Sequence, residues 1–540
     1  MAAPKQTKAT AYEATVRFLE TARKPAVLDP GDDPIPIGTD NFKLERRGEA
    51  ATLEVWSETR NLVRRLRAVH SEHRGRLELE VERFGGLTGR LALVDLAHPA
   101  SRDTSRRGAR LKYRERFRRS LLRQFPSWRI AELSTEADLH HSLSPSYPRA
   151  LLRKGGSALA AIGAAEDALD VDGALTFGLI WLDYVRRRET RVPVQGLAIF
   201  VPEGKEATTC HRIRYLDDAA RNWQVADLPH FGQSMRTGEQ APGYAVFVHY
   251  PDGTEEAVDP RDYTNFDTRV QPFSRPLAAP CHRPLAASPT QLLDWVERLA
   301  EIENVTRRDH PDGAVSLAVH GLEFARAEGG RMSFGLDHRI EVSTEAQLAQ
   351  IQIAEIEALA RGLAERRDAR QDRVHPLYSR HPEAWLESQV RSNIERVDAA
   401  LLPHPLYGQV PQFAAGERGM LDILAADRSG RLVIVEVKAS QDIHLPLQAL
   451  DYWMRVKWHL ERGEFAGRGY FPGLELRADP PRLLLVAPAL DFHPSNETVL
   501  RFFSREVEVE RIGVGIEWRQ ELRVMFRSPA PVCRSPFSTR

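Results

Sequence analysis

The sequence is poor in cysteine, since its 540 residues include only Cys210, Cys281 and Cys533. These three lack CxxC spacing and cannot all pair, which argues against a disulfide framework and against a structural zinc site. Long apolar runs are also missing, and the first residues contain no apolar core of a secretory signal. We therefore expect a cytoplasmic protein without a membrane partner.

Net charge is the next absence, because 75 Lys and Arg balance 75 Asp and Glu. Attraction to DNA or RNA would have to come from local patches. No GxxxxGK[ST] stretch occurs, so a built-in helicase motor is not expected. Lysine is scarce too: only nine of the 75 basic residues are Lys. Lys438 is therefore a candidate functional residue, because the chain otherwise strongly prefers arginine to lysine.

The length of the chain predicts several domains, because one hydrophobic core does not extend over 540 residues. Strand-like and helix-like patterns alternate, which predicts an α/β (α+β) multidomain protein with a mixed α/β N-terminal region. The expected parts are an N-terminal arm (1–45), a mixed α/β domain of unknown role (46–270), a proline-rich linker (271–290), a helical and hairpin connector domain (291–375), a C-terminal domain (376–527) and a disordered tail (528–540).

A basic segment at 106–129 interleaves arginine with aromatic residues. Helical spacing predicts one apolar stripe, made of Tyr113, Phe117, Leu121 and Leu122. It leaves Arg114, Arg118 and Arg119 on other faces, where they could contact phosphates without reading sequence. An arginine-rich face opposite an apolar stripe is, however, usually just a solvated surface.

The most informative stretch is Gly419–Tyr452. Apolar runs at Met420–Ala425 and Leu432–Val437 flank a turn at Asp427–Gly430, which predicts a β-hairpin. Side chains alternate along a strand, so Glu436 and Lys438 project to the same side. The hairpin can also bring Asp422 of the partner strand toward Glu436.

Carboxylates held so close together repel each other, and a folded protein tolerates them mainly when a cation lies between them. Oxygen ligands favour Mg²⁺ or Mn²⁺. Such an ion can polarise a phosphoryl oxygen and lower the pKa of a water, and Lys438 could orient that water or stabilise negative charge on phosphate. The chemistry indicated is phosphodiester hydrolysis.

These residues resemble the PD-(D/E)XK nuclease superfamily, which has a restriction-endonuclease-like αβββαβ core. The matching elements expected here are a helix at Pro382–Leu401 carrying Glu387, a strand at Gln409–Phe413, the two hairpin strands, a helix at Leu445–Arg462 and a strand at Arg482–Ala487. The resemblance extends over roughly Glu383 to Pro488. It implies a metal-dependent (endo)nuclease domain at 376–527.

The resemblance also assigns roles to single residues. Asp422, Glu436 and Lys438 match D…(D/E)XK, although the proline of the motif's name is not beside Asp422. The resemblance implies a metal held by Glu387, Asp422, Glu436 and the Val437 carbonyl.

Further motif residues match the RecB-like branch, and similar residues occur in NucS-like endonucleases. Gln448 and Tyr452 match its QxxxY, and Gly419 with Asp422 matches its GxxD. Gln448 would then position Lys438 or a water; the alternative is that it caps the sheet edge while Tyr452 packs in the core. His444 precedes the same helix and could touch substrate or lie on a loop surface.

A similar order of strand, helix and strand occurs before the predicted linker. A strand at Ala158–Ile162, a helix at Leu175–Arg188 and a strand at Gly196–Val201 follow one another. Where Glu436 and Lys438 would align, this region offers only Gly163, Ala164 and Ala165. A related fold would have lost the motif, and convergence of two α/β units is the simpler explanation.

Two functions are consistent with the sequence. The first is a Mg²⁺- or Mn²⁺-dependent nuclease that cuts DNA rather than RNA, with repair or defence as possible roles and an N-terminal region for targeting or regulation. The second is a catalytically inert nuclease fold that acts as a scaffold for nucleic acid or protein. A long helix expected at 344–370 could serve as a spacer or as a surface for a protein partner or homo-oligomer.

Overall fold

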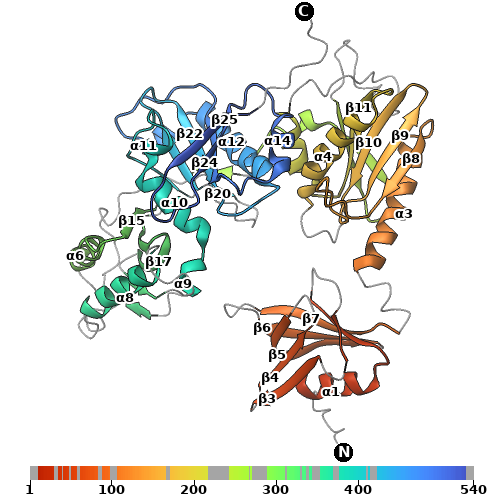
Figure 1. The fold of residues 1–540 in the computed structure, drawn as a ribbon, viewed down its shortest axis with the longest axis horizontal. Helices are drawn as coiled ribbons and strands as arrows, with labels where there is room; N and C mark the ends of the chain where they lie inside the picture. Colours follow the sequence, from red (N-terminus) through yellow and green to blue (C-terminus); the bar gives the residue numbers. More distant parts are fainter. Residues whose placement is uncertain are drawn as a thin grey trace, which may run out of the picture. The chain divides into compact units, whose positions relative to one another are not determined.

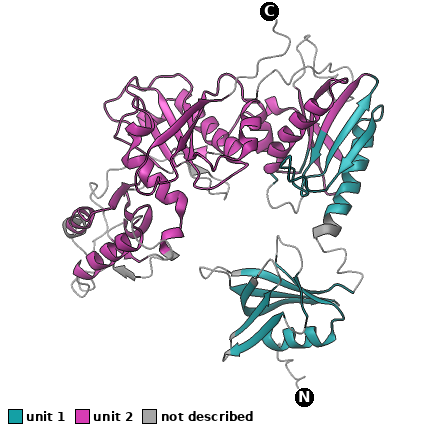
Figure 2. Ribbon diagram, in the orientation of Figure 1, with its two compact units in different colours: residues 1–155, 161–171, 200–202 teal, residues 156–160, 172–199, 203–540 magenta. Residues whose placement is uncertain are grey.

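The computed structural model places helices and strands from Thr10 onward (Figure 1). The residues it describes are 10–29, 35–38, 41–47, 50–56, 61–73, 75–82, 88–97, 106–165, 171–216, 243–266, 268–270, 289–310, 313–328, 331–335, 340–342, 353–368, 376–408, 412–413 and 422–530. The chain divides into two compact units (Figure 2): unit 1 holds residues 1–155, 161–171 and 200–202, and unit 2 holds the remainder. The expectation of a mixed α/β multidomain chain is confirmed.

Unit 1 begins with a helix packed on a seven-stranded antiparallel sheet of order β2-β1-β7-β6-β5-β4-β3. Its elements are α1 (Ala11–Thr21), β1 (Pro25–Leu28), β2 (Ile35–Pro36), β3 (Phe42–Arg47), β4 (Ala50–Trp56), β5 (Asn61–His73), β6 (Arg76–Glu82) and β7 (Thr88–Asp95). Period-2 alternation along β6 buries Leu77, Leu79 and Val81.

The predicted arm at 1–45 is wrong for its described residues, which form α1 and strands of this sheet. A capping box starts the helix: the Glu13 amide donates to the Thr10 hydroxyl, and the Thr10 amide donates to the Glu13 carboxylate. Phe18 then lies in the core of the sheet. The capping box of Thr10 and Glu13 therefore lies where the first described helix of this domain begins.

The predicted basic helix is α3 (Arg106–Gln124). Phe117 and Leu121 are fully buried and Tyr113 nearly so, as the stripe predicted. Leu122 is 42% exposed and does not belong to the stripe, because it lies 100° around the helix from Leu121. Tyr113 and Phe117 lie over Gly163, where a Cβ would come within 2.8 Å of the tyrosine oxygen.

A six-stranded sheet has the order β13-β12-β11-β10-β9-β8. Its strands and the helices between them are β8 (Arg129–Ser134), β9 (Arg149–Lys154), β10 (Ser157–Gly163), α4 (Gly173–Arg188), β11 (Val194–Pro202), α5 (Glu206–Ile213), β12 (Tyr244–His249) and β13 (Glu255–Val258). The expected strand, helix and strand correspond to β10, α4 and β11. α4 is buried along most of its length, which fits its high apolar content.

Unit 2 contains a five-stranded antiparallel meander with two helices, from α6 to α8. Its elements are α6 (Pro289–Ala300), β15 (Val305–Asp309), β16 (Val315–Val319), β17 (Leu322–Glu328), β18 (Arg331–Phe334), β19 (Ile340–Val342) and α8 (Ile353–Arg366). It has its own core around Phe324 and Met332. The helix predicted at 344–370 is α8, and 344–352 lie outside the described residues, as do 271–288 of the predicted linker.

The C-terminal part of unit 2 is an α/β domain with the sheet order β21-β22-β23-β24-β25. Its elements are α9 (Pro376–Ser379), α10 (Pro382–Ser392), α11 (Ile394–Val397), β21 (Ile423–Ala426), β22 (Leu432–Val437), α12 (Leu445–Glu461), α13 (Glu464–Gly467), β23 (Arg482–Pro488), α14 (Pro494–Leu500), β24 (Val509–Val514) and β25 (Val524–Pro529). β22, β23 and β24 run parallel, and β21 and β25 are antiparallel to their neighbours. Leu and Val fill the central strands, as expected for strands buried on both faces.

Two predicted elements of this domain differ from the structure. Of the strand expected at Gln409–Phe413, the described residues form β20 (Gln412–Phe413), which pairs with β14 (Thr268–Arg269) outside the main sheet, and 409–411 lie outside the described residues. The segment 401–407 instead runs along β21 through isolated bridges, because its two prolines interrupt a continuous ladder. The predicted helix to Leu401 ends at Ser392 and restarts as α11.

The start of the predicted disordered tail at 528–540 also needs correction. Ser528 and Pro529 belong to β25, paired with β24, and 531–540 lie outside the described residues. Among the helices of the described ranges, none combines the length and the apolar character needed to cross a membrane.

Candidate functional site

The hairpin of β21 and β22 brings the predicted carboxylates together. Ile423 pairs with Val435, so the next residues outward, Asp422 and Glu436, face each other across the hairpin. The Val437 amide donates to Asp422 Oδ2 at 2.7 Å and fixes that carboxylate. The turn at Asp427–Gly430 supports this register, since Asp427 Oδ1 accepts from the amides of Ser429 and Arg431.

Both carboxyl groups are held away from water. Burial raises the pKa of Glu436 well above its ordinary value, and the charge of Asp422 adds to the effect. Burial raises the pKa of Asp422 to about 7, with a further contribution from Glu387. Among the described residues, Glu436 Oε2 is buried and has no hydrogen-bond partner. The pair is therefore an incompletely satisfied acidic centre.

Lys438 follows β22 and lies near Glu436 and Asp422, as predicted, and near two further carboxylates, those of Glu383 and Asp442. Its Nζ is 3.8 Å from Glu436 Oε1, 3.8 Å from Asp442 Oδ2 and 4.0 Å from Glu383 Oε2. Burial alone would lower the pKa of Lys438, but the surrounding carboxylates outweigh it and raise that pKa. The amine is therefore a permanent cation and a hydrogen-bond donor. We call Asp422, Glu436 and Lys438, with the carboxylates near them, the acidic site.

Glu387 of α10 is close enough to raise the pKa of Asp422, but its charge is already compensated. Its Oε1 accepts from Arg391 at 2.8 Å and from Arg308 of β15 at 2.9 Å. Burial would raise the pKa of Glu387, yet these two guanidinium groups lower it. Arg391 also donates to the Asp422 carbonyl, so it ties α10 to the hairpin.

Glu383 is a site residue that the sequence interpretation missed. It lies one turn before Glu387 on α10 and approaches Lys438. The spacing of four residues could have indicated it, because both side chains then lie on the same helix face. Asp442 also approaches Lys438, and its Oδ1 accepts from the His444 amide at 2.8 Å.

The predicted helix residues lie on α12, which begins at Leu445. Tyr452 is buried, and burial raises its pKa, with added contributions from the charges of Glu436 and Asp422. Tyr452 therefore lies near the acidic site while also packing in the core. Gln448 is half-buried one turn earlier on the same helix. Gly419 lies outside the described residues.

His444 caps the start of α12 and contacts α4. Its Nδ1 is 3.2 Å from the Thr176 hydroxyl, and its ring meets Phe177 edge-on at 5.6 Å. From the sequence we expect His444 either to touch substrate or to lie on a loop surface. The structure adds a third role, because His444 contacts another domain. This contact places α4 next to a residue that adjoins the acidic site.

The three predicted phosphate-contacting arginines are exposed on α3 in unit 1. Arg118 pairs with Glu115 at 3.4 Å, and Arg119 donates to the Glu115 carbonyl at 3.4 Å. Arg114 is also exposed. Their exposure fits either phosphate contact or a solvated face.

A metal ion remains a prediction for this site. Within the described residues, no three His, Cys, Asp or Glu side chains are already arranged around a common point as metal ligands. The donor set still fits a hard cation, because two buried carboxyls face each other and Glu436 Oε2 is unsatisfied. Asp422, Glu436, Glu387 and the carbonyl of Val437 are the candidate ligands.

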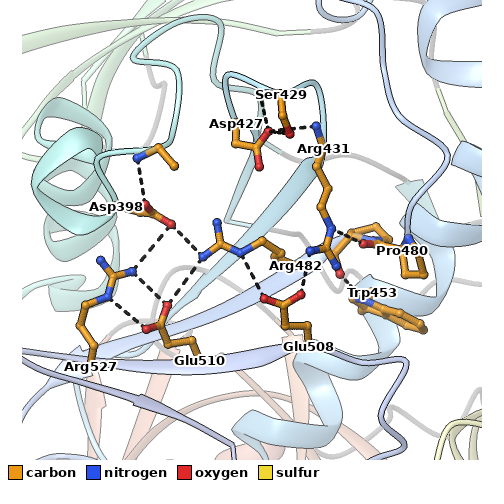
Figure 3. Close-up of polar contacts among 12 residues, drawn as sticks. Asp398, Asp427, Ser429, Arg431, Trp453, Pro480, Arg482, Glu508, Glu510 and Arg527 are labelled. Atoms are coloured by element: carbon orange, nitrogen blue, oxygen red, sulfur yellow. Dashed lines mark hydrogen bonds and ion pairs between the residues drawn. The ribbon is translucent and has the colours of Figure 1, made fainter.

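A second polar cluster lies at the opposite ends of the same strands (Figure 3). Arg482 pairs with Asp398 at 2.8 Å, Arg431 pairs with Glu508 at 2.7 Å, and Arg527 pairs with Glu510 at 3.0 Å. Every carboxylate in this cluster has an arginine partner. The cluster therefore reads as a structural network that fixes strand ends, in contrast to the acidic site.

Comparison of this chain with protein-family models, with curated proteins and with solved structures finds no match. The chemistry of the site therefore rests on its own residues.

Proposed function

We propose that the C-terminal domain is a Mg²⁺- or Mn²⁺-dependent nuclease that hydrolyses phosphodiester bonds in DNA. The observation that carries the proposal is the pairing of half-buried Asp422 with buried Glu436 beside Lys438, with Glu436 Oε2 unsatisfied. Keeping two repelling carboxylates in a buried site costs stability, which a binding surface alone does not require. The resemblance to PD-(D/E)XK nucleases points to the same chemistry.

Each residue has a part in this proposal. Asp422 and Glu436 would hold the ion with the Val437 carbonyl and Glu387, and the bound ion would polarise a phosphoryl oxygen and acidify a water. Lys438 donates hydrogen bonds to the attacking water or to the phosphate as negative charge develops. The Val437 amide keeps Asp422 oriented through its 2.7 Å hydrogen bond. Arg391 and Arg308 hold Glu387 in place.

The test is cleavage of single-stranded, double-stranded and branched DNA, and of RNA, with Mg²⁺ or Mn²⁺. We expect metal-dependent cutting that Glu436→Gln and Lys438→Met abolish. Lys457→Met is the matched control, because Lys457 is the other lysine of this domain and pairs with Glu461 and Glu506 away from the site. Equal cutting by wild type and Glu436→Gln would exclude the acidic site as the catalytic centre.

A second candidate is an inert nuclease fold that binds nucleic acid or protein. One observation favours it: Glu387 already has two arginine partners, which compete with a metal for that carboxylate. This candidate expects no cutting and no Mn²⁺ binding that Glu436→Gln removes. Calorimetry with Mn²⁺ therefore separates the two candidates independently of substrate choice.

A further inference from the structure

The chain contains the same topology twice. From α3 to β13 the order is helix, three strands, helix, strand, helix and two strands, and the sheet order β8 to β13 follows the chain. From α10 to β25 the order is the same, with the bridged segment 401–407 in the place of the first strand. We call these the first copy and the second copy.

The correspondence extends to single backbone hydrogen bonds. Leu197 N donates to Gly243 O in the first copy, and Leu483 N donates to Glu508 O in the second. Six residues further along, Glu203 N donates to His249 O, and Ala489 N donates to Val514 O. β12 and β24 are six residues long, and each pairs antiparallel with the next strand. Two α/β units that became similar by chance have no need to share the same spacing of hydrogen bonds between their strands.

The contacts between the copies in unit 2 are reciprocal. In the two element orders, α4 corresponds to α12, and α5 corresponds to α14. α4 packs against α14, and α12 packs against α5, so each contact repeats the other with the two copies exchanged. Between them, Leu216 bridges Phe503, each three residues after the end of its helix, α5 or α14. Residue i contacting j while j contacts i is the signature of a two-fold axis. The two copies thus form an internal pseudo-dimer.

Only the second copy carries the acidic site. Lys438 N donates to Val486 O, and the corresponding bond in the first copy runs from Ala164 N to Phe200 O. Ala164 therefore takes the place of Lys438, and Ile162, two residues earlier, takes the place of Glu436. Both residues are buried and apolar. The first copy can hold neither a cation nor a proton at this position.

We propose that one chain acts as a pseudo-dimer with a single competent centre and cuts one strand of duplex DNA in each binding event. The inference rests on the proposed nuclease function and specifies its product. The two strands of a duplex are antiparallel and related by two-fold axes, so cutting both at once requires two centres. Here α12 and α14 of the second copy already pack against α5 and α4 of the first copy, so the partner domain in this pseudo-dimer is one without the acidic residues.

Relaxation of supercoiled plasmid by the full chain tests this inference. We expect nicked circles to accumulate first, with linear DNA formed only later by independent second nicks. The rate should be first order in protein, and light scattering should give the 61.0 kDa of one chain under the same conditions. Linear product from the start, or a rate that rises with the square of protein concentration, would overturn the single-centre inference and leave the nuclease function standing.

Mixing wild type with Glu436→Gln provides the matched control. Independent single centres predict that an equal mixture cuts about twofold more slowly, in proportion to active chains, with the same products. A shift from linear to nicked product on mixing would instead show cooperation between two chains and would overturn the inference. A complete lack of cutting by wild type on every substrate would remove the nuclease function and this inference together.

Discussion

Replacing Asp422 with asparagine should separate stability from activity. Asp422 is half-buried, and the desolvation of its carboxyl raises its pKa from 3.8 to about 7. The difference is about three pKa units at about 1.36 kcal/mol each, or about 4 kcal/mol. Because the folded state holds the proton more tightly than the unfolded state, stability falls as pH rises through this interval. Asp422→Asn removes that loss and retains an oxygen for the Val437 amide.

We therefore expect Asp422→Asn to stabilise metal-free protein at pH 8 by up to about 4 kcal/mol, since the charge it removes is buried. For a domain of 150–250 residues, each kcal/mol raises the melting temperature by about 2–4 °C. The gain should shrink toward pH 4, which lies well below the raised pKa of folded Asp422 and close to its ordinary value of 3.8 in the unfolded chain. The assay is thermal melting of wild type and variant with EDTA at pH 4, 6 and 8, followed by fluorescence of Trp385 and Trp453, which are buried in this domain.

Asp427→Asn is the control of opposite sign. Burial would raise the pKa of Asp427, but hydrogen bonds from Ser429 and Arg431 lower it. This substitution should destabilise the protein at pH 8 and have less effect at low pH. A stabilisation by Asp422→Asn that does not depend on pH, or a destabilisation at pH 8, would refute the argument that an ionised Asp422 strains the metal-free site.

Three further changes probe the surroundings of the site. Arg308→Ala removes one cation from Glu387 and should tighten Mn²⁺ binding about tenfold in calorimetry, about 1.4 kcal/mol, whereas the neighbouring Arg307→Ala should not; equal affinities would argue against Glu387 as a ligand. Gly321→Ala puts a Cβ 1.9 Å from a backbone oxygen of α10 at φ +75°, so the melting temperature should fall and an unchanged value would contradict this packing. Arg212→Met breaks the bidentate ion pair between Arg212 and Asp451 of α12, which should lower the free energy of unfolding by about 3–5 kcal/mol. If the variant unfolds at the same denaturant concentration as wild type, this result would contradict the interface between the copies.

Local sequence patterns predicted the elements whose structure is decided locally. The hairpin from Ile423 to Val437 and the helix from Leu445 follow from a turn, from β-branched runs and from helical spacing. The same rules would have located α1 had the capping box at Thr10 been recognised. The strand expected at Gln409–Phe413 failed because neighbour choice in a sheet is a tertiary property.

The acidic site also combines residues that local patterns predicted with residues that depend on tertiary contacts. Asp422, Glu436 and Lys438 lie within 17 positions of one another, and strand alternation was enough to bring them together. The partners of Glu387 were not predictable in this way, because Arg308 lies 79 positions away on another domain. The contact between His444 and Thr176 spans 268 positions and had no local signal. Local patterns thus predicted which carboxylates and which lysine come together, but not the residues that restrain them.

The strongest argument for chemistry at the acidic site is its contrast with the remainder of the same sheet. At the other ends of the strands, Asp398, Glu508 and Glu510 each have an arginine partner (Figure 3). This chain, with its many arginines, could have paired Asp422 and Glu436 as well. Instead half-buried Asp422 and buried Glu436 face each other, with a lysine 3.8 Å from Glu436. The first copy, which replaces these positions with Ile162 and Ala164, shows that the fold tolerates apolar residues there. Packing alone therefore does not account for the carboxylates, whereas the bound cation that we propose would.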